Sequence, residues 1–200
     1  MWPAARAARR RGYEVINWGY ASSRFPIAEH AIALDRALGA RLRAAGGRVH
    51  FLTHSLGGIV VRVYLARTPL STLGRVAMLG PPNGGNEIAE HLRGTPAFRW
   101  LMGPPGQELG TGDRSVPRRL PPVAFDLGVI AGVRRRPALF GRWIGSPNDG
   151  LVSVAATRVA GMRDHIVVPG GHALLPWNPW ALRQAFAFLE TGEFDRPVAR

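Results

Sequence analysis

Three side chains of this sequence have the chemistry and the chain order of a nucleophilic triad: Ser55, Asp149 and His172. A serine hydroxyl hardly ionises at neutral pH. It attacks a carbonyl carbon only when a general base takes its proton and a third group orients that base. The order serine, acid, histidine is found in hydrolases whose serine lies on a strand-to-helix turn. These three residues therefore predict acyl-transfer chemistry if the fold brings them together.

Ser55 lies in the stretch 48–62, RVHFLTHSLGGIVVR, which is typical of a short buried strand, a sharp turn and a helix. This is the layout of a nucleophile elbow, whose usual pattern is Gly-x-Ser-x-Gly. Small residues are needed two positions before and after the serine because strand and helix approach closely there. Gly57 meets this requirement, whereas Thr53 meets it only loosely. Taken alone, the stretch is equally compatible with a turn that caps an ordinary helix.

The candidates for the general base are the histidines that follow the serine, His91, His165 and His172. In parallel α/β sheets the chemistry lies beyond the carboxyl ends of the strands. His165 begins a predicted strand and so belongs to the opposite edge, and His91 lies in a helical segment well before the acid candidates. His172 follows the last predicted strand on a Gly-Gly loop, which can turn its imidazole toward Ser55. We expect His172 to be the base; the alternative is a loop histidine at the surface.

The acid is expected between the serine and the histidine. Asp126 and Asp164 stand at or before strand starts, at the wrong edge of the sheet, and Asp113 lies in an irregular segment. Asp149 lies in a tight polar loop at residues 145–150 and is the best candidate. The alternative is a plain Asn-Asp-Gly turn.

An acyl-transfer site also needs hydrogen-bond donors for the oxyanion. The backbone N–H of Leu56, at the start of the predicted elbow helix, supplies one. The second normally comes from a loop after an earlier strand, and no such strand and loop precede Tyr13. No metal or cofactor is required by this chemistry. Without a second donor, the alternative is a catalytically impaired or inactive protein of the same fold.

The elements around these residues alternate between strand and helix. Strands are predicted at residues 13–18, 49–52, 75–79, 123–130 and 165–168. Helices are predicted at residues 4–11, 26–45, 56–68 and 178–189, the second from apolar residues that recur every three or four positions. This alternation predicts an α/β fold with a mostly parallel sheet covered by helices on both faces. The length of 200 residues suits one domain, residues 1–200.

Residues 86–122 hold no strong strand signal and interrupt the alternation. A long excursion of this kind between core elements is often a lid or a substrate-binding insertion. Its aromatic and proline-rich part, residues 98–105, hints at an apolar acyl site. The alternative is a structural connector.

The composition limits the other functions. There is no cysteine, which excludes thiolate chemistry and disulfides, and no apolar run is as long as a membrane helix needs. The formal net charge is +13, and all 26 basic residues are arginines. They are scattered apart from two short clusters, at residues 9–11 and 134–136, with no recognisable nucleic-acid motif. Nucleic acid is therefore disfavoured as a partner, and a basic anion-binding module is the less favoured alternative function.

The motifs together resemble one family. Four segments follow one another in the right order, at residues 53–58 (THSLGG), 78–85 (MLGPPNGG), 147–154 (PNDGLVSV) and 164–172 (DHIVVPGGH). This series resembles the bacterial α/β-hydrolases of the serine lipase/esterase type, and is similar to small lipases of the GPI-inositol-deacylase-like group. The resemblance runs from about Arg11 to Phe194. It implies a Ser-Asp-His triad at Ser55, Asp149 and His172, an acyl-enzyme, a small-molecule or lipid ester as substrate, and contact with a lipid surface.

The start of the sequence departs from the family pattern. Members usually begin with an apolar strand that ends in a His-Gly loop, the source of the second oxyanion donor, whereas Met1 falls inside what resembles the following helix. In the family that strand lies beside the nucleophile strand, so residues 49–52 are expected to lack a neighbour on one side. We expect a truncated or misplaced start. The visible basic N-terminus lacks the apolar region of a signal peptide, which favours the cytoplasm unless the true start lies upstream.

Overall fold

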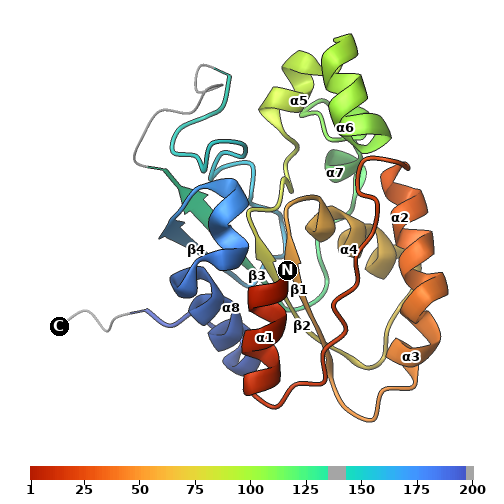
Figure 1. Ribbon diagram of the computed structural model, residues 1–200, viewed down its shortest axis with the longest axis vertical. Helices are drawn as coiled ribbons and strands as arrows, with labels where there is room; N and C mark the ends of the chain where they lie inside the picture. Colours follow the sequence, from red (N-terminus) through yellow and green to blue (C-terminus); the bar gives the residue numbers. More distant parts are fainter. Residues whose placement is uncertain (135–142, 197–200) are drawn as a thin grey trace.

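The computed structural model describes residues 1–134 and 143–196 and is built on a four-stranded parallel sheet (Figure 1). Its strands are β1 (Val49–His54), β2 (Leu73–Leu79), β3 (Leu127–Val133) and β4 (Asp164–Pro169), in that spatial order. All three neighbouring pairs are parallel, so the carboxyl ends of the strands meet at one edge. The predicted α/β fold with a parallel sheet is confirmed.

Strand β2 shows how the sheet divides the core. Its residues from Val76 to Leu79 are fully buried, and alternate side chains of a strand point to opposite faces. Val76 and Met78 pack with residues of the helices on one face, whereas Ala77 and Leu79 pack with residues of the helices on the other. A strand buried on both faces needs a continuous apolar run, which this segment has.

Helices cover both faces of the sheet (Figure 1). On one face lie α1 (Trp2–Arg10) and α8 (Pro179–Thr191). On the other lie α2 (Ile27–Leu34), the π-helical turn η1 (Asp35–Gly39), α3 (Ala40–Arg43) and α4 (Leu56–Arg67). The helix predicted from residue 26 onward is therefore confirmed in position, with its centre wound as a π-helix. No helix in the described residues is both long and apolar enough to cross a bilayer.

The strand predicted at residues 13–18 is wrong. This segment has no regular secondary structure and pairs with no strand. Its aromatic side chains pack on other rings instead: Tyr13 lies 6.3 Å from Phe186 and Trp18 lies 4.9 Å from Tyr20, between ring centroids. Apolar and aromatic residues satisfy a strand pattern as well as a packed loop, and only backbone pairing separates the two.

Strand β1 ends the sheet on its side, with β2 as its only strand neighbour among the described residues. It is also less buried than β2 and β3, with five of its six residues partly exposed. The expectation that residues 49–52 lack a neighbour on one side agrees with this order. The outer side of β1 instead faces a cavity of about 1660 Å³.

Two further predicted boundaries moved. Strand β3 begins at Leu127 rather than at residue 123, because the Val123 N–H donates to the Ala160 carbonyl instead of joining the β2 ladder. Residues 86–122 hold no strand, as expected, but form three helices: α5 (Glu87–Leu92), α6 (Pro96–Glu108) and α7 (Val116–Arg119). In the second arginine cluster, residues 135 and 136 lie outside the described part of the chain.

Helix α6 is bent at Gly103, whose φ of 59° interrupts the helical backbone ahead of Pro104 and Pro105. A Cβ at Gly103 would lie 1.7 Å from the Ser23 carbonyl oxygen. Only glycine allows both this backbone angle and this approach. The bend therefore holds α6 against the loop that precedes α2.

Candidate active site

Ser55 lies between β1 and α4 in a strained backbone conformation. Its φ of 53° and ψ of −127° make it the only non-glycine residue with positive φ in the described chain. Such a conformation costs about 1–3 kcal/mol and persists where the surrounding structure imposes it. Here β1 must pass directly into α4, and the turn lifts the Ser55 side chain above the carboxyl edge of the sheet.

The tightest packing at this turn is at Gly58 rather than at Gly57. A Cβ on Gly58 would lie 3.0 Å from the Met78 sulfur and 3.1 Å from the Pro81 Cβ, whereas one on Gly57 would make an ordinary 3.7 Å contact with the Thr53 Cβ. Thr53 is itself buried and fits beside both glycines. The small residue that the close approach demands is therefore supplied one position later than the motif indicates.

A chain of short hydrogen bonds connects Ser55, His172 and Asp149. The His172 Nε2 atom lies 2.8 Å from the Ser55 Oγ, and the Nδ1 atom lies 2.7 Å from the Asp149 Oδ2. A carboxylate only accepts hydrogen bonds, so Nδ1 carries the proton of the neutral imidazole. Nε2 is then free to accept the Ser55 hydroxyl proton, which is the arrangement that a general base needs.

Backbone contacts hold the acid and the base in place. The second carboxylate oxygen of Asp149 accepts from the N–H groups of Leu151 and Val152 at 3.0 and 2.8 Å, and the His172 N–H donates to the Asp149 carbonyl at 2.9 Å. Asp149 is 1% exposed and His172 is 8% exposed. A buried carboxylate with this many donors is fixed in one rotamer, so the imidazole beside it has one orientation.

Two glycines at the strand ends make room for this pair. A Cβ on Gly80, just beyond β2, would lie 3.1 Å from the Asp149 Oδ2 and 3.2 Å from the His172 Nδ1. A Cβ on Gly132, near the end of β3, would lie 2.9 Å from the Asp149 Cβ. Gly80 also has a φ of +55°, which favours glycine on its own account. Their role depends on tertiary contacts that a sequence pattern does not reveal.

Sequence reasoning missed His54, which contacts the candidate base from the carboxyl end of β1. Its Nε2 lies 3.0 Å from the His172 carbonyl oxygen, and the two rings are 4.8 Å apart. A carbonyl can only accept, so Nε2 is the protonated nitrogen of His54. Burial, and secondarily the charge that His172 can carry, lowers the pKa of His54 to about 4. The neutral His54 side chain therefore connects the end of β1 to the loop that carries His172 through this hydrogen bond.

The Leu56 N–H lies at the start of α4, where the first N–H groups of a helix have no intrahelical acceptor. This position is suited to receive negative charge, because the positive end of the helix dipole lies there. Among residues 1–134 and 143–196, no group of three His, Asp or Glu side chains could hold a metal ion.

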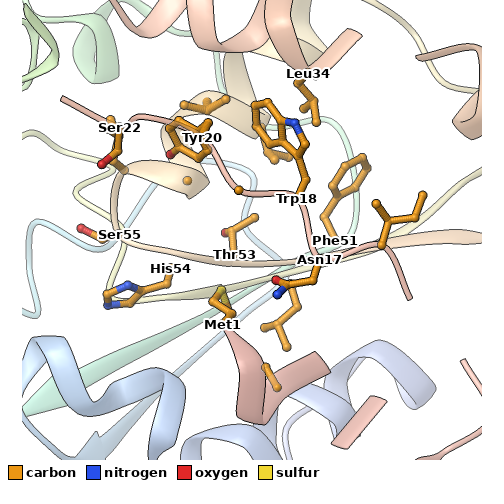
Figure 2. Close-up of a pocket in the computed structure, with 18 of the residues that line it drawn as sticks. Met1, Asn17, Trp18, Tyr20, Ser22, Leu34, Phe51, Thr53, His54 and Ser55 are labelled. Carbon is orange, nitrogen blue, oxygen red and sulfur yellow. The ribbon is translucent and has the colours of Figure 1, made fainter. Parts of the chain in front are cut away.

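Ser55 opens into the cavity beside β1 (Figure 2). Tyr20, Ser22, His54 and Ser55 lie at the same end of this cavity in the figure. Its walls also include apolar residues from the insertion: Ile88, Leu92, Phe98, Leu101, Met102 and Pro105. The volume of about 1660 Å³ exceeds the roughly 300–1,000 Å³ of most small-molecule sites.

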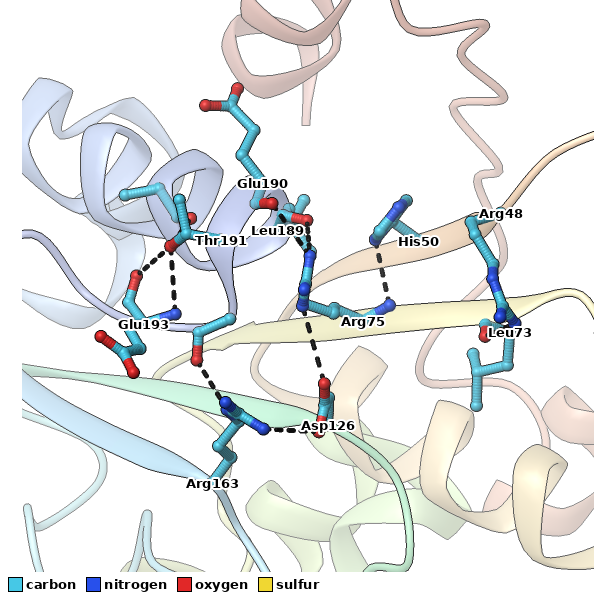
Figure 3. A network of polar contacts seen from close by, with 12 residues as sticks. Arg48, His50, Leu73, Arg75, Asp126, Arg163, Leu189, Glu190, Thr191 and Glu193 are labelled. Atoms are coloured by element: carbon cyan, nitrogen blue, oxygen red, sulfur yellow. Dashed lines mark hydrogen bonds and ion pairs between the residues drawn. The ribbon is translucent and has the colours of Figure 1, made fainter.

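The other sequence candidates lie elsewhere. Asp126 is paired with Arg75 and Arg163 at the amino ends of β2 and β3, next to the end of α8 (Figure 3). Asp164 is paired with Arg196 at the start of β4. This is the sheet edge opposite Ser55.

The rejected histidines and Asp113 also have other surroundings. The His165 Nε2 contacts the Thr157 Oγ1 at 2.9 Å. The ring of His91 is exposed on α5, with its Nδ1 2.8 Å from the Glu87 carbonyl oxygen. Asp113 is exposed within the insertion. None of these three is among the described residues that line the cavity at Ser55.

The sequence matches no protein-family model and no curated protein. The structure is similar to three solved bacterial or metagenomic proteins. Phospholipase PlaB from Legionella pneumophila matches at a TM-score of 0.64 and 19% identity, over 94% of this chain and 55% of that one. The metagenomic carboxyl esterase MGS0156 matches at 0.65 and 18%, over 86% and 58%. Bacillus licheniformis lipase BlEst2, in its propeptide form, matches at 0.64 and 17%, over 90% and 43%.

This chain thus spans about half the length of these three relatives. At such identities the similarity concerns the fold, not the activity. The parallel strand order, the serine turn between β1 and α4, and the three matches agree with one another. The chain has the α/β-hydrolase fold of bacterial lipases and esterases.

Proposed function

We propose that this protein is a serine hydrolase of carboxylic esters, with Ser55 as nucleophile, His172 as general base and Asp149 as the acid that orients it. The observation that carries the proposal is the hydrogen-bond chain from the Asp149 Oδ2 through His172 to the Ser55 Oγ, at 2.7 and 2.8 Å. Ser55 stands on a strained strand-to-helix turn and lines an apolar cavity. The similarity to a carboxyl esterase, a lipase and a phospholipase supports the same class of reaction.

The proposed reaction has two halves. Ser55 Oγ attacks the acyl carbon while His172 Nε2 takes its proton, and the carbonyl oxygen becomes an oxyanion beside the Leu56 N–H. Collapse of this intermediate breaks the bond to the leaving alcohol, which receives the proton from His172. Water, which gives a proton to His172, then attacks the acyl carbon. The bond from that carbon to the Ser55 Oγ breaks, the carboxylic acid leaves, and His172 returns the proton to Ser55. An alcohol in place of water would give acyl transfer with the same residues.

We also propose that residues 86–122 form a lid-like insertion in a single domain of residues 1–200. Helix α6 supports this role because Phe98, Leu101 and Met102 line the cavity while Trp100 is 86% exposed on its outer side. Exposed large apolar side chains of this kind are common where proteins touch lipid. The proposed substrates therefore include lipid esters presented at a surface.

Ester turnover by Ser55→Ala tests the proposed reaction. We expect loss of about 10⁴-fold or more in kcat for a soluble short-chain aryl ester, because triad members act as a unit. Ser71→Ala is the matched control, since Ser71 is exposed just before β2, at the opposite end of the strands from Ser55. Equal turnover by wild type and Ser55→Ala would overturn the proposal. Covalent labelling of Ser55 by a fluorophosphonate, without ester turnover in the wild type, would instead support an impaired hydrolase.

A further inference from the structure

The proposed reaction has one identified oxyanion donor, the Leu56 N–H, and sites of this kind use at least two. Tyr20, which also lines the cavity, lies close to the first turn of α4. The hydroxyl of Tyr20 lies 3.9 Å from the place that a Cβ on Gly57 would occupy. Tyr20 thus approaches the helix start beside Leu56, and Figure 2 shows it at the same end of the cavity as Ser55.

The Tyr20 hydroxyl is free to donate a hydrogen bond to a bound substrate. It forms no hydrogen bond with any described residue, although Tyr20 is only partly exposed and lines the cavity. The hydroxyl is not among the buried polar atoms that lack a partner, so it is open to the cavity and can donate a hydrogen bond to a group bound there. Burial also raises the pKa of Tyr20 to about 12, so its proton stays in place at any pH at which an ester hydrolase works.

The ring that carries this hydroxyl is held from two sides. The Trp18 ring stacks on it at 4.9 Å with an interplanar angle of 18°, and the buried His30 ring lies at 4.7 Å. A donor fixed in this way needs little rearrangement when negative charge develops, which is the condition for strong oxyanion stabilisation. Residues 13–18, where the sequence predicts a strand, therefore contribute Trp18 to the packing around the Tyr20 ring.

We propose that the Tyr20 hydroxyl is the second donor to the oxyanion, opposite the Leu56 N–H. This assignment rests on the proposed ester hydrolysis. As the bond between Ser55 Oγ and the acyl carbon forms, the carbonyl electron pair moves onto oxygen, and that oxygen accepts hydrogen bonds from Leu56 and Tyr20. No proton leaves Tyr20, and His172 alone supplies the proton of the leaving alcohol.

Tyr20→Phe removes the hydroxyl and keeps the ring stack. We expect kcat for a short-chain aryl ester to fall about 10²–10³-fold, as for loss of one oxyanion donor, with much less change in KM. Tyr64→Phe is the matched control, because it also removes a tyrosine hydroxyl but at a residue that does not line this cavity, and it should retain most activity.

The outcomes separate this assignment from the proposed reaction itself. Tyr20→Phe with unchanged kcat, beside an inactive Ser55→Ala, would overturn the role of Tyr20 and leave the triad in place. Equal losses in Tyr20→Phe and Tyr64→Phe would show that the loss of a tyrosine hydroxyl acts through the fold, and would also overturn the role of Tyr20. A wild-type chain whose turnover does not depend on Ser55 would overturn both proposals.

Discussion

The two sides of Ser55 are built in opposite ways. On one side, the Asp149 carboxylate accepts three hydrogen bonds of 2.7–3.0 Å and, like His172, is nearly inaccessible to water. On the other side, β1 ends the sheet, a cavity of about 1660 Å³ opens, and the Tyr20 hydroxyl has no partner among the described residues. The first side holds its polar groups in fixed hydrogen bonds, and the second leaves the Tyr20 hydroxyl open to the cavity.

The difference follows from the elements that supply each side. The packed side is formed at the carboxyl ends of β2, β3 and β4, which are anchored by sheet hydrogen bonds, with Gly80 and Gly132 against Asp149. The open side is formed by the segment before α2 and by the insertion, where aromatic stacking and side-chain packing replace backbone pairing. Substitutions on the packed side should therefore lower the free energy of unfolding. Substitutions on the open side should mainly change how the protein binds its substrate.

Gly80→Ala should have the largest structural effect. A methyl group there would lie 3.1 Å from the Asp149 Oδ2 and 3.2 Å from the His172 Nδ1, on a backbone with φ of +55°. We expect a loss of about 2–4 kcal/mol in the free energy of unfolding, from the backbone angle and the overpacking together. Chemical denaturation measures it.

Gly46→Ala is the matched control, because a Cβ at Gly46 would meet nothing within 4 Å. It should stay within about 0.5 kcal/mol of the wild type. Equal free energies of unfolding for Gly80→Ala and Gly46→Ala would show that the residues around Gly80 accommodate a methyl group, contrary to what their contacts indicate.

The pH dependence of stability should come partly from His54. Burial lowers its pKa to about 4, below the roughly 6.5 of an unfolded chain. The unfolded state therefore binds the proton first, and the stabilisation present above pH ~6.5 is lost as the pH falls toward about 4. In His54→Gln, the loss of unfolding free energy between pH 7 and pH 5 should be smaller by about 1–2 kcal/mol.

Denaturation curves at the two pH values provide the measurement. His91→Gln serves as control, because it removes an exposed histidine on α5, and it should leave the pH dependence as in the wild type. An unchanged pH dependence in His54→Gln would mean that the ring is accessible to protons on the cavity side.

Trp100→Ser should have the smallest effect on the fold and a selective effect on substrate. Trp100 is 86% exposed on α6, so unfolding should change by no more than about 0.5 kcal/mol. Binding to phosphatidylcholine vesicles should weaken roughly tenfold, because one large apolar side chain buried in lipid contributes ~1.5–3 kcal/mol. Hydrolysis of a soluble short-chain ester should not change.

Trp180→Ser, on α8, gives the comparison in the same vesicle assay, since Trp180 is 42% exposed on a different helix. Equal weakening by both variants would argue against a lipid-facing role specific to the insertion.

The sequence was most informative on the packed side. Chain order and strand polarity singled out Asp149 and His172, and these residues lie within hydrogen-bond distance of each other and of Ser55. This works because the carboxyl ends of parallel strands must meet. The same logic placed Asp126 and Asp164 at the far edge, where both are paired with arginines.

The open side was the less predictable one. Residues 13–18 carry a strand-like pattern, but a strand also needs a partner, which local sequence does not encode. The roles of Gly80, Gly132 and His54 depend on contacts between residues far apart in the chain, such as His54 and His172, which are 118 positions apart. No spacing rule within one segment reveals such contacts.

The most direct test of Ser55 as the nucleophile is its covalent labelling by a fluorophosphonate, followed by mass spectrometry of the peptide that contains residues 48–62. We expect one adduct on Ser55 in the wild type and a labelling rate lower by orders of magnitude in His172→Gln, because the hydroxyl then has no base. An unlabelled Ser55, or labelling at the same rate without His172, would contradict the proposed hydrolase.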